Sequence, residues 1–554
     1  MIRKLTCRLA LLLAAIAHPL PALADTLVDH VDGLTVDREG RVERFTGLVI
    51  DNDGKVRQLL RRGDKRPAKV DYLVDGKGRV LIPGMIDSHV HMIQIGMTTL
   101  MLDLTGTKSL AEAQARIAAH AAAHPDKPWI LGFGWNQESW GLGRMPTAAE
   151  IDAAVTDRPV WLMRVDGHAG WANSAAMTAA GITAASRAPA GGRIDRIAGS
   201  TRPSGILVDA ATDLVQRIVP APRPEDRDLA LSNAQDILLR QGITAVADMG
   251  TTIDDWQAFR RAGDSGGLRL RIMAYAAGID AMVLIGGPAP TPWLYDDRLR
   301  LNGVKLFVDG ALGSHGAALK APYADDPGNS GLLLTDSTKL GNQMSRAAMD
   351  NFQVAVHAIG DAANRLVLDA IEELSETYKG DRRWRIEHAQ IVDPADLARF
   401  GKHGIVASMQ PVHQASDRAM AEVRLGPSRL AGAYAWNGLA NAGARLAFGS
   451  DAPVEAPDPF AGIATAITRQ DANGQPFDGW QPQERISREA ALAAYTAGAA
   501  HAGFAEGRFG RLAVGERADF LLVDEDPLLA PATAVRNITV EQTWVAGRLA
   551  WSKP

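Results

Sequence analysis

Six residues of the 554-residue sequence, five of metal-binding types and one lysine, each lie within or directly after a short apolar run. Two are histidines separated by a single residue, and the other four are far apart along the chain. Neutral imidazole and carboxylate groups are common zinc ligands, so the set predicts a metal-binding site. The six residues are His89, His91, Lys305, His357, His388 and Asp451.

The His89–His91 pair is a weak signal when it is taken alone. Side chains alternate between the two faces of a strand, so the two histidines point the same way and can hold one cation. Most pairs of this kind are nevertheless ordinary core or surface histidines. The metal-binding interpretation depends on three further residues in the sequence. His357 and His388 each end a β-rich run, and Asp451 offers a carboxylate.

Lys305 is the unusual member of the set, because an ammonium group cannot bind a metal. A lysine near two cations loses its proton readily, since like charge disfavours the charged form. The free amine can then take up carbon dioxide, and the resulting carbamate can bridge two metals. The alternative is a lysine whose charge extends from a strand end to solvent. The presence of the other five residues favours the carbamate.

The runs that carry these residues alternate with Ala- and Leu-rich helical stretches across residues 85–504, which favours an α/β fold with a parallel sheet. In a (β/α)8 TIM barrel the active site lies at the carboxyl ends of the strands. His357 and His388 are about one βα unit apart. We therefore assign these two to strands 5 and 6, Lys305 to strand 4, Asp451 to strand 8 and the histidine pair to strand 1.

Two further units accompany the predicted barrel. Residues 25–84 consist of short strand-like runs and tight turns, and residues 505–554 show the same pattern. We therefore expect one small β-sandwich formed from both termini. The gap between His91 and Lys305 exceeds three βα units by roughly a hundred residues or more. This excess predicts an inserted α/β subdomain at about residues 106–235.

Residues 1–24 have the pattern of a secretory signal peptide. Arg3, Lys4 and Arg8 give a positive start, an apolar stretch follows, and residues 22–24 have the small-x-small form of a cleavage site. A permanent membrane anchor is the alternative, but the apolar run is well short of the roughly 20 residues that span a bilayer. We expect an exported protein, periplasmic in a Gram-negative bacterium, that is not embedded in the membrane after cleavage.

The composition is that of an ordinary soluble globular chain, with 46% hydrophobic and 22% charged residues. The formal net charge is −5 and no run of lysines and arginines stands out, so nucleic acid is not expected as a partner. Removal of the signal peptide also removes Cys7, the one cysteine of the sequence. The mature chain would then have neither disulfides nor thiolate chemistry.

Candidate substrate contacts lie in the predicted insertion and in one barrel loop. Arg164 and His168 lie at and just after the end of an apolar run, and His168 belongs to an Asp-Gly-His segment. Trp135 could line an apolar pocket for an acyl or aryl amide, or pack the core of the insertion itself. His315 lies in a glycine-rich loop after Lys305, at the catalytic end of a strand, and this loop is a candidate lid.

The order and surroundings of the six residues resemble the two-metal ligand set of the amidohydrolase superfamily. Residues 83–91 resemble its first-strand signature, and residues 448–454 resemble its last. Residues 510–520 resemble its return into the β-sandwich. More narrowly, the chain resembles amidohydrolase family 3, the YtcJ-like metal-dependent hydrolases, at residues 166–174, 305–310 and 357–361.

The resemblance implies two divalent cations, with zinc as the first candidate, bridged by a hydroxide and by carbamylated Lys305. One cation would lie with the histidine pair and Asp451, and the other with His357 and His388. The hydroxide would attack a non-peptide C–N bond of a small-molecule amide, with Asp451 carrying the proton from the water to the leaving nitrogen. A homodimer is common among the proteins that the chain resembles.

Three other functions are open at this point. A mononuclear, deaminase-like member of the superfamily would leave Lys305 unmodified and use one metal. A lactonase or other esterase would use the same metals on an ester. A non-catalytic periplasmic binding protein on an inactive barrel would not need Asp451 as a proton shuttle, and the presence of this residue argues against it.

Overall fold

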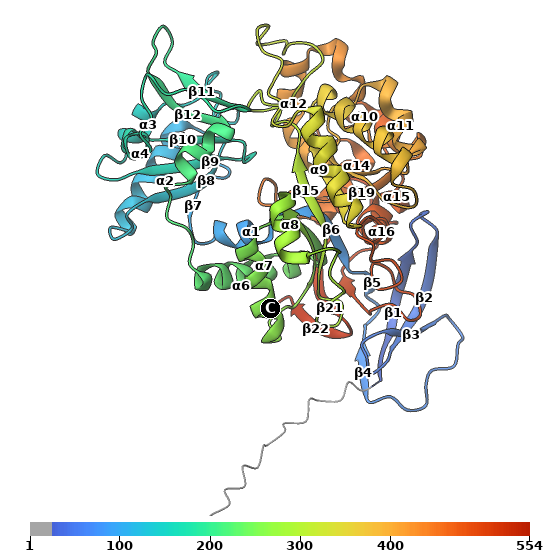
Figure 1. The fold of residues 1–554 in the computed structure, drawn as a ribbon. Coiled ribbons are helices and arrows are strands. Elements are labelled where there is room, and N and C mark those ends of the chain that lie inside the picture. Colours follow the sequence, from blue (N-terminus) through green and yellow to red (C-terminus); the bar gives the residue numbers. More distant parts are fainter. Residues whose placement is uncertain (1–24) are drawn as a thin grey trace, which may run out of the picture.

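The computed structural model describes residues 25–554, which form three sheets; helices accompany the barrel and the inserted sheet, and the sheet with β1–β4 (residues 26–75) lies at the edge of the molecule (Figure 1). The predicted signal peptide, residues 1–24, lies outside the described residues. One sheet is a parallel barrel, one is a six-stranded sheet inserted into the barrel sequence, and one joins strands from near both ends of the described chain. None of the helices within residues 25–554 combines the length and the apolar character that crossing a membrane requires.

Eight parallel strands form a nearly closed barrel, which confirms the predicted barrel. Each strand pairs with the next in chain order, and a backbone bridge between Val90 and Ala452 joins the first strand to the segment after the last. Along the same seam the amide of Asp451 donates to the carbonyl oxygen of His89 at 2.7 Å. The strands are β6 (Met85–Val90), β13 (Ile243–Thr251), β14 (Arg271–Ala277), β15 (Leu299–Phe307), β16 (Gln353–Ala358), β17 (Arg385–His388), β18 (Val406–Met409) and β19 (Arg445–Phe448).

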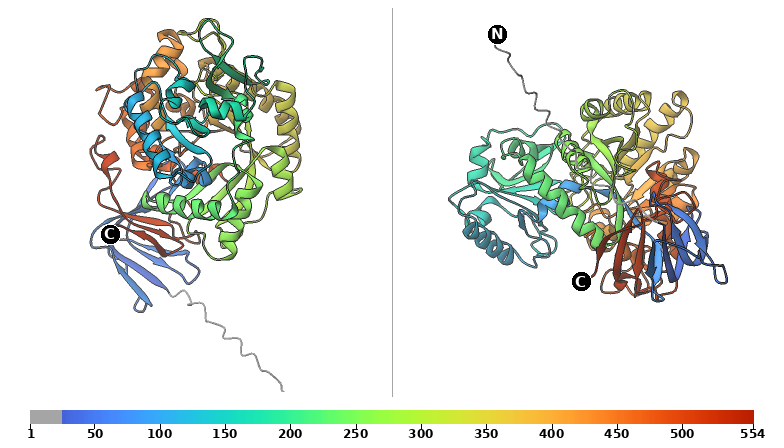
Figure 2. Two further views of the ribbon diagram at one scale, coloured as in Figure 1. Left: turned by 90° about the vertical axis from the view of Figure 1, so that its left-hand side faces the viewer. Right: turned by 90° about the horizontal axis from the view of Figure 1, so that it is seen from below.

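Helices surround the barrel strands (Figure 2). Helix α10 (Asp361–Thr377) shows why these segments are helical, because Val367, Leu368 and Ile371 recur at helical spacing and are fully buried. The other helices of this layer are α1 (Met92–Thr98), α6 (Pro224–Arg240), α7 (Ile253–Asp264), α8 (Gly278–Gly286), α9 (Ser337–Met349), α11 (Leu397–Lys402), α12 (Pro411–Leu425), α13 (Trp436–Asn441), α14 (Pro459–Thr468), α15 (Arg488–Ala494) and α16 (Ala497–Ala502).

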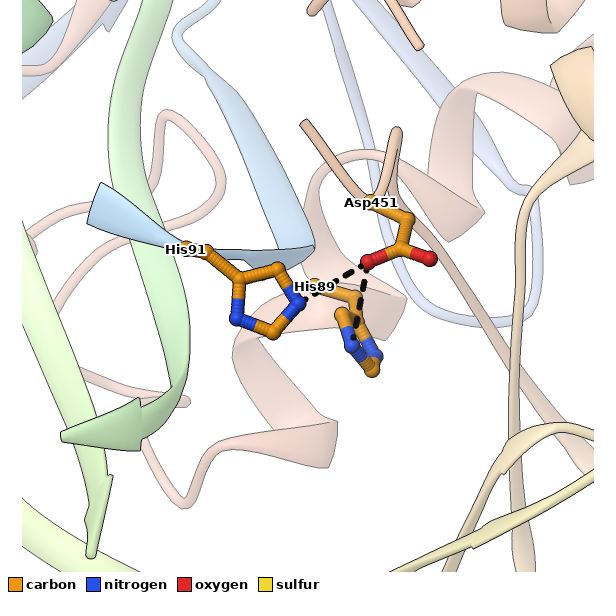
Figure 3. Close-up of side chains that lie close together, drawn as sticks. All are labelled: His89, His91 and Asp451. Atoms are coloured by element: carbon orange, nitrogen blue, oxygen red, sulfur yellow. Dashed lines mark hydrogen bonds and ion pairs between the residues drawn. The ribbon is translucent and has the colours of Figure 1, made fainter. Parts of the chain in front are cut away.

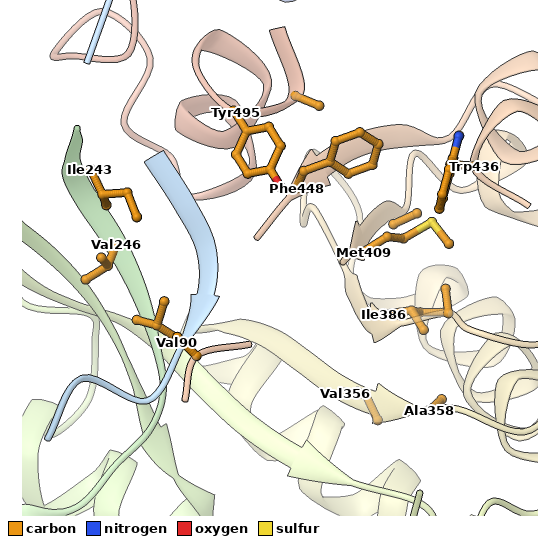
Figure 4. Close-up of a cluster of buried hydrophobic side chains, with 14 of the residues drawn as sticks. Val90, Ile243, Val246, Val356, Ala358, Ile386, Met409, Trp436, Phe448 and Tyr495 are labelled. Atoms are coloured by element: carbon orange, nitrogen blue, oxygen red, sulfur yellow. The ribbon is translucent and has the colours of Figure 1, made fainter. Parts of the chain in front are cut away.

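Apolar side chains of strands and helices share one core (Figure 4). The ring of Phe448 on β19 lies 6.2 Å from that of Trp436 and 5.7 Å from that of Tyr495, between ring centres. Val90 and Val246 belong to the neighbouring strands β6 and β13. Because parallel strands are buried on both faces, they appear in the sequence as continuous apolar runs.

Strands from both ends of the described chain form one eight-stranded sheet. The two halves meet where Pro83 pairs with Phe520. Arg271 of β14 donates to both oxygens of Asp519 at 2.6 and 2.8 Å, and this buried ion pair links the sheet to the barrel. The pairing shows one sheet, and the sandwich arrangement stays a prediction. The strands are β1 (Thr26–Val36), β2 (Val42–Ile50), β3 (Val56–Leu60), β4 (Tyr72–Asp75), β5 (Val80–Pro83), β20 (Phe520–Val523), β21 (Val540–Val545) and β22 (Arg548–Ser552).

A six-stranded sheet with four helices lies in the sequence between α1 and α6. This inserted unit runs from Leu102 to Gln216, whereas the predicted insertion covers about residues 106–235. Helix α6 packs against α1 and α7 and belongs to the barrel layer. The inserted elements are β7 (Leu102–Asp103), α2 (Leu110–Ala123), β8 (Ile130–Trp135), α3 (Ala148–Asp152), β9 (Val160–Arg164), β10 (Ala169–Ala172), α4 (Ser174–Ala179), β11 (Gly192–Arg196), β12 (Pro203–Asp209) and α5 (Asp213–Gln216).

Candidate metal centre

His89, His91 and Asp451 come together where the first and last barrel strands meet (Figure 3). His91 Nε2 lies 3.1 Å from Asp451 Oδ1, and His89 Nε2 lies 3.4 Å from the same oxygen. Strand β6 ends at Val90, so His91 is the N-cap of α1 and not the strand residue that the alternation argument assumed. The ligand atoms of the three residues lie within 4.8 Å of one another, a spacing that suits one shared metal ion.

The Lys305 side chain enters this group from β15 and is almost completely buried. Its Nζ atom lies 3.3 Å from His89 Nε2. Burial lowers the pKa of Lys305 to about 8, because a low-dielectric environment disfavours the ammonium form. The neutral amine, which carbamate formation requires, is therefore within reach near neutral pH.

His357 and His388 lie at the carboxyl ends of β16 and β17, with ring centres 4.6 Å apart. His357 Nε2 faces the carbonyl oxygen of Gly310 at 3.4 Å, and His388 Nδ1 faces Gln410 Oε1 at 3.0 Å. Each of these contacts uses one ring nitrogen and does not involve the other. Burial lowers the pKa of both histidines well below the usual value, so both are neutral, which is the form that binds metals.

The backbone is strained at two of the six positions. His388 has a φ of 72° and Asp451 a φ of 60°, in the left-handed region that residues other than glycine rarely adopt. Strained residues persist only where the surrounding structure holds them, and they are concentrated at functional sites. The strained backbone at these two positions therefore sets the direction of the His388 and Asp451 side chains.

Glu387, which could not be selected from the sequence, contacts the His89 ring on the side away from Asp451. Its Oε2 atom lies 2.7 Å from His89 Nδ1, and Arg385 donates to its Oε1 atom at 2.8 Å. Burial favours the neutral acid, but the charge of Arg385 and the bond to His89 outweigh it and lower the pKa of Glu387. A carboxylate on one ring nitrogen of a histidine orients the other nitrogen toward a metal.

Asp309, in the segment that follows β15, fixes the neighbouring loop. It is fully buried and accepts hydrogen bonds from the amides of Ala318, Ile359 and Gly360 at 2.8 to 3.0 Å. Burial raises the pKa of this carboxyl to about 7. These bonds tie the loop after β15 to the end of β16, beside His357.

A cavity of about 420 Å³ opens onto three of the candidate metal ligands. His357, His388 and Asp451 form part of its lining. The inserted unit contributes Arg164 and His168, and α12 and the segment after β19 contribute further residues. A small molecule bound here would contact the barrel, the inserted unit and the candidate metal ligands together.

The structure brings two of the four predicted substrate contacts, Arg164 and His168, to this cavity. Arg164 Nη1 donates to Asp166 Oδ2 at 2.5 Å. His168 Nδ1 lies 2.7 Å from Asp209 Oδ1, and the ring centre lies 5.1 Å from that of His357. Burial lowers the pKa of His168, but the bond to Asp209 and its charge outweigh this effect and raise the pKa to about 9. The ring is thus a cation at neutral pH.

The other two predicted contacts, Trp135 and His315, are not among the residues that line the cavity. Trp135 is fully buried in the core of the inserted unit, where its Nε1 donates to the carbonyl oxygen of Leu162 at 2.8 Å. His315 Nε2 instead pairs with Asp325 at 3.2 Å. Its loop contributes only neighbouring residues such as Gly313 to the cavity. Packing inside the inserted unit keeps Trp135 out of the cavity, and the contact with Asp325 in the loop keeps His315 out of it.

Helix α12 adds cavity residues that the sequence analysis missed. His413, Ser416, Asp417 and Met420 follow one another at helical spacing and all line the cavity. The i, i+3, i+4, i+7 spacing in the sequence indicates that these residues share one face of a helix. It does not indicate whether that face contacts a cavity or the barrel core.

The donor set fits divalent metal ions. It consists of three buried histidines whose pKa burial lowers, the partly buried His91 and a buried carboxylate; the three buried histidines are His89, His357 and His388. Burial favours the neutral acid at Asp451, but the nearby histidines outweigh it and lower the pKa of this carboxyl well below the usual value. Imidazole and carboxylate ligands suit zinc, and also manganese, cobalt and iron.

A parallel barrel that gathers histidines and an aspartate at the carboxyl ends of its strands defines the class of metal-dependent barrel hydrolases. A family model described as the amidohydrolase family matches residues 73–550. The chain therefore belongs to the amidohydrolase family, within its family 3 group of YtcJ-like proteins, and is a metal-binding hydrolase.

Three relatives cover most of the chain. The protein LONG AFTER FAR-RED 3 of Arabidopsis thaliana is 38% identical over 81% of this chain and 79% of its own length. YtcJ of Bacillus subtilis (strain 168) is 32% identical over 86% of this chain and 90% of its own length. An N-substituted formamide deformylase of Arthrobacter pascens is 26% identical over 87% of this chain and 90% of its own length.

Solved structures share the fold. The crystal structure of an uncharacterized metal-dependent hydrolase from Pyrococcus horikoshii OT3 has a TM-score of 0.72 and 27% sequence identity. The match covers 92% of this chain and 99% of that one. The likeness therefore extends over the terminal sheet and the insertion as well as the barrel.

Proposed function

We propose that the protein hydrolyses a non-peptide C–N bond of a small-molecule amide with two divalent cations, zinc as the first candidate. The observation that carries the proposal is the cluster around Asp451. The ligand atoms of His89, His91 and Asp451 lie within 4.8 Å of one another, and Asp451 lines the cavity together with His357 and His388. A relative that is named an N-substituted formamide deformylase supports amides as the substrate class. N-substituted formamides are the first substrates to test.

The residues divide into two ligand groups. We assign His89, His91 and Asp451 to one cation, and His357 and His388 to the other. Lys305, as a carbamate, would lie between them, since its Nζ atom lies 3.3 Å from His89 Nε2. Bound divalent cations lower the pKa of water toward neutrality and polarise a carbonyl group.

Asp451 is the proton-transfer residue of this proposal. Its low pKa keeps it ionised, so it can accept a proton from the attacking water. Its Oδ1 atom faces the histidine pair, and its Oδ2 atom faces His388 and His413 on the cavity lining. The same carboxyl group can then deliver the proton to the leaving nitrogen.

Arg164 and His168 are the proposed substrate contacts from the inserted unit. Arg164 is held by Asp166, and the protonated His168 is held by Asp209. Asp209 thereby leaves His168 Nε2 as a hydrogen-bond donor close to His357. A donor at this position suits the oxygen of the scissile carbonyl group, on which negative charge develops.

Metal content per chain tests the proposal, together with an intact mass measured under gentle conditions. We expect about two metals and a mass increase for the Lys305 carbamate. Lys305→Ala should lose the mass increase, the paired metals and amide turnover together. One metal that is insensitive to Lys305→Ala would favour the mononuclear, deaminase-like alternative. Faster turnover of lactones than of amides would favour the esterase.

We also propose that residues 1–24 direct export to the periplasm of a Gram-negative bacterium and that the mature chain forms a homodimer. The support for export is the signal-peptide pattern of the sequence. Cell fractionation with N-terminal sequencing tests the first proposal, and light scattering tests the second. A cytoplasmic chain that retains residue 1, or a monomer, would contradict the corresponding proposal.

A further inference from the structure

Two carboxylates of the cavity have no part in the proposed metal centre. Asp417 of α12 accepts hydrogen bonds from Tyr434 Oη at 2.9 Å and from Gln390 Nε2 at 3.1 Å. Glu455, in the segment after β19, accepts a hydrogen bond from Ser416 Oγ. These donors are neutral, and within residues 25–554 no lysine or arginine forms an ion pair with either carboxylate.

Other charged groups of the lining, by contrast, have partners of opposite charge. These pairs are Arg164–Asp166, His168–Asp209 and Glu138–Arg424. Burial raises the pKa of both Asp417 and Glu455, and the nearby His413 offsets this effect only in part. A bound cation would relieve this cost.

His413 supplies a second sign that this wall of the cavity binds a ligand. It precedes Asp417 by one turn of α12 and is only 8% exposed. Its Nε2 atom has no hydrogen-bond partner among the described residues and lies 3.8 Å from Asp451 Oδ2. With His388 and Asp451 it also forms a group whose ligand atoms lie within 4.8 Å of one another, so it stands between the metal centre and Asp417. Buried polar atoms are almost always hydrogen-bonded, so this atom calls for a partner that enters the cavity.

A second cavity of about 420 Å³ begins at Glu455. It lies between α1 and the inserted unit, with Ile95 and Phe133 in its lining. The two cavities share Glu455, Ser416 and other lining residues, so the carboxylate of Glu455 stands where they meet. A molecule that extends past Glu455 from the metal centre has room for a substituent there.

We propose that Asp417 and Glu455 form a subsite for the ammonium group that amide hydrolysis releases, and that the substituent of this amine extends into the second cavity. The inference rests on the proposed function. Hydrolysis adds water across the C–N bond and yields a carboxylate and an ammonium ion. Asp451 Oδ2, which delivers the proton, faces His413 and thus the side of the cavity that carries Asp417. The new cation therefore forms beside two unpaired carboxylates.

Calorimetric titration of the zinc-loaded protein at pH 7 tests the subsite, with butan-1-amine as the cationic probe and butan-1-ol as its neutral counterpart. We expect the ammonium form to bind at least about tenfold more tightly than the alcohol. Glu455→Gln and Asp417→Asn should each weaken ammonium binding about tenfold and leave alcohol binding unchanged. Equal affinity of the two probes for the natural sequence would overturn the proposal.

Glu376→Gln is the matched control, because this glutamate is 87% exposed on α10, outside the cavity lining. Circular dichroism and zinc content verify that each variant is folded and loaded. Asp417→Asn also alters the bond to Tyr434, so Glu455→Gln, with its single hydroxyl partner, is the decisive variant. An amine that binds only to zinc would keep its affinity in Glu455→Gln, and this result would reject the subsite.

Hydrolysis of N-butylformamide, measured separately, distinguishes the two proposals. If the amide is hydrolysed and Glu455→Gln binds butylammonium as before, the subsite is wrong and the proposed function stands. If butylammonium binding depends on Glu455 but N-butylformamide is not hydrolysed, the ammonium-binding site stands and N-substituted formamides are wrong as the proposed substrates.

Discussion

Glu387 Oε2 lies 2.7 Å from His89 Nδ1, while the other nitrogen of the same ring faces Asp451 and Lys305. The two residues are far apart in the sequence and meet because β6 and β17 belong to one barrel. The carboxylate determines which ring nitrogen carries the proton, so Nε2 is the nitrogen left to bind a metal.

Glu387→Gln should weaken metal binding roughly 10- to 100-fold, because an amide orients the His89 ring less strongly than a carboxylate does. Competition with a chelator of known affinity measures the change. Glu376→Gln, at an exposed position, is the control. An unchanged zinc affinity in Glu387→Gln would show that the barrel alone orients His89.

Asp451→Asn should lower kcat by roughly 10²- to 10⁴-fold, because an amide side chain cannot transfer the proton. The zinc content should fall much less, since the histidine ligands stay in place. Asp126→Asn, at an exposed position of the inserted unit, is the control. Full turnover by Asp451→Asn would exclude the proposed role of this carboxyl group.

Asp209→Asn should destabilise the protein in a pH-dependent manner. The pKa of His168 is raised to about 9 in the folded protein, so the ion pair contributes its full stability below the ordinary histidine pKa of 6.5. This contribution is lost as the pH rises through about 9. We expect a loss of about 2–4 kcal/mol at pH 6, since each pKa unit corresponds to about 1.36 kcal/mol.

Denaturant unfolding of both proteins between pH 6 and pH 10 measures this difference in the free energy of unfolding. Effects of pH that do not involve the pair cancel in the comparison. Asp195→Asn, which removes the partner of the partly exposed Arg193, is the control. A difference that stays constant across this range would rule out the charged His168.

Asp519→Asn should destabilise the chain by about 3–5 kcal/mol, because Arg271 would be left as a buried charge without a partner. The loss should reduce the melting temperature and separate the terminal sheet from β14. Arg61→Ala removes an exposed ion pair with Glu43 and should cost below about 1 kcal/mol. Equal effects of the two variants would show that burial of the pair is unimportant.

Much of the architecture could be predicted from the sequence, because the strands of a parallel barrel are buried on both faces and appear as apolar runs. The residues after these runs meet at one rim of the barrel whatever the details of packing. For this reason His357, His388 and Asp451 could be brought together without a structure, as could the histidine pair and Lys305. Their roles as metal ligands, the carbamate and the export signal stay predictions.

The cavity wall was decided by the tertiary structure. Arg164 and Trp135 are both in the inserted unit, yet Arg164 lines the cavity and Trp135 packs the core of the insertion. The local sequence does not distinguish them, because the direction of each side chain depends on how the inserted sheet packs against the barrel.

The same reason explains His413 and Glu387, which the sequence analysis did not select. A helical pattern identifies one face of α12 but does not identify what that face contacts. Glu387 acquires a role only through His89, to which no local pattern connects it. The sequence alone thus determined which residues stand at the strand ends, whereas long-range packing determined the walls around them and the partners that hold them.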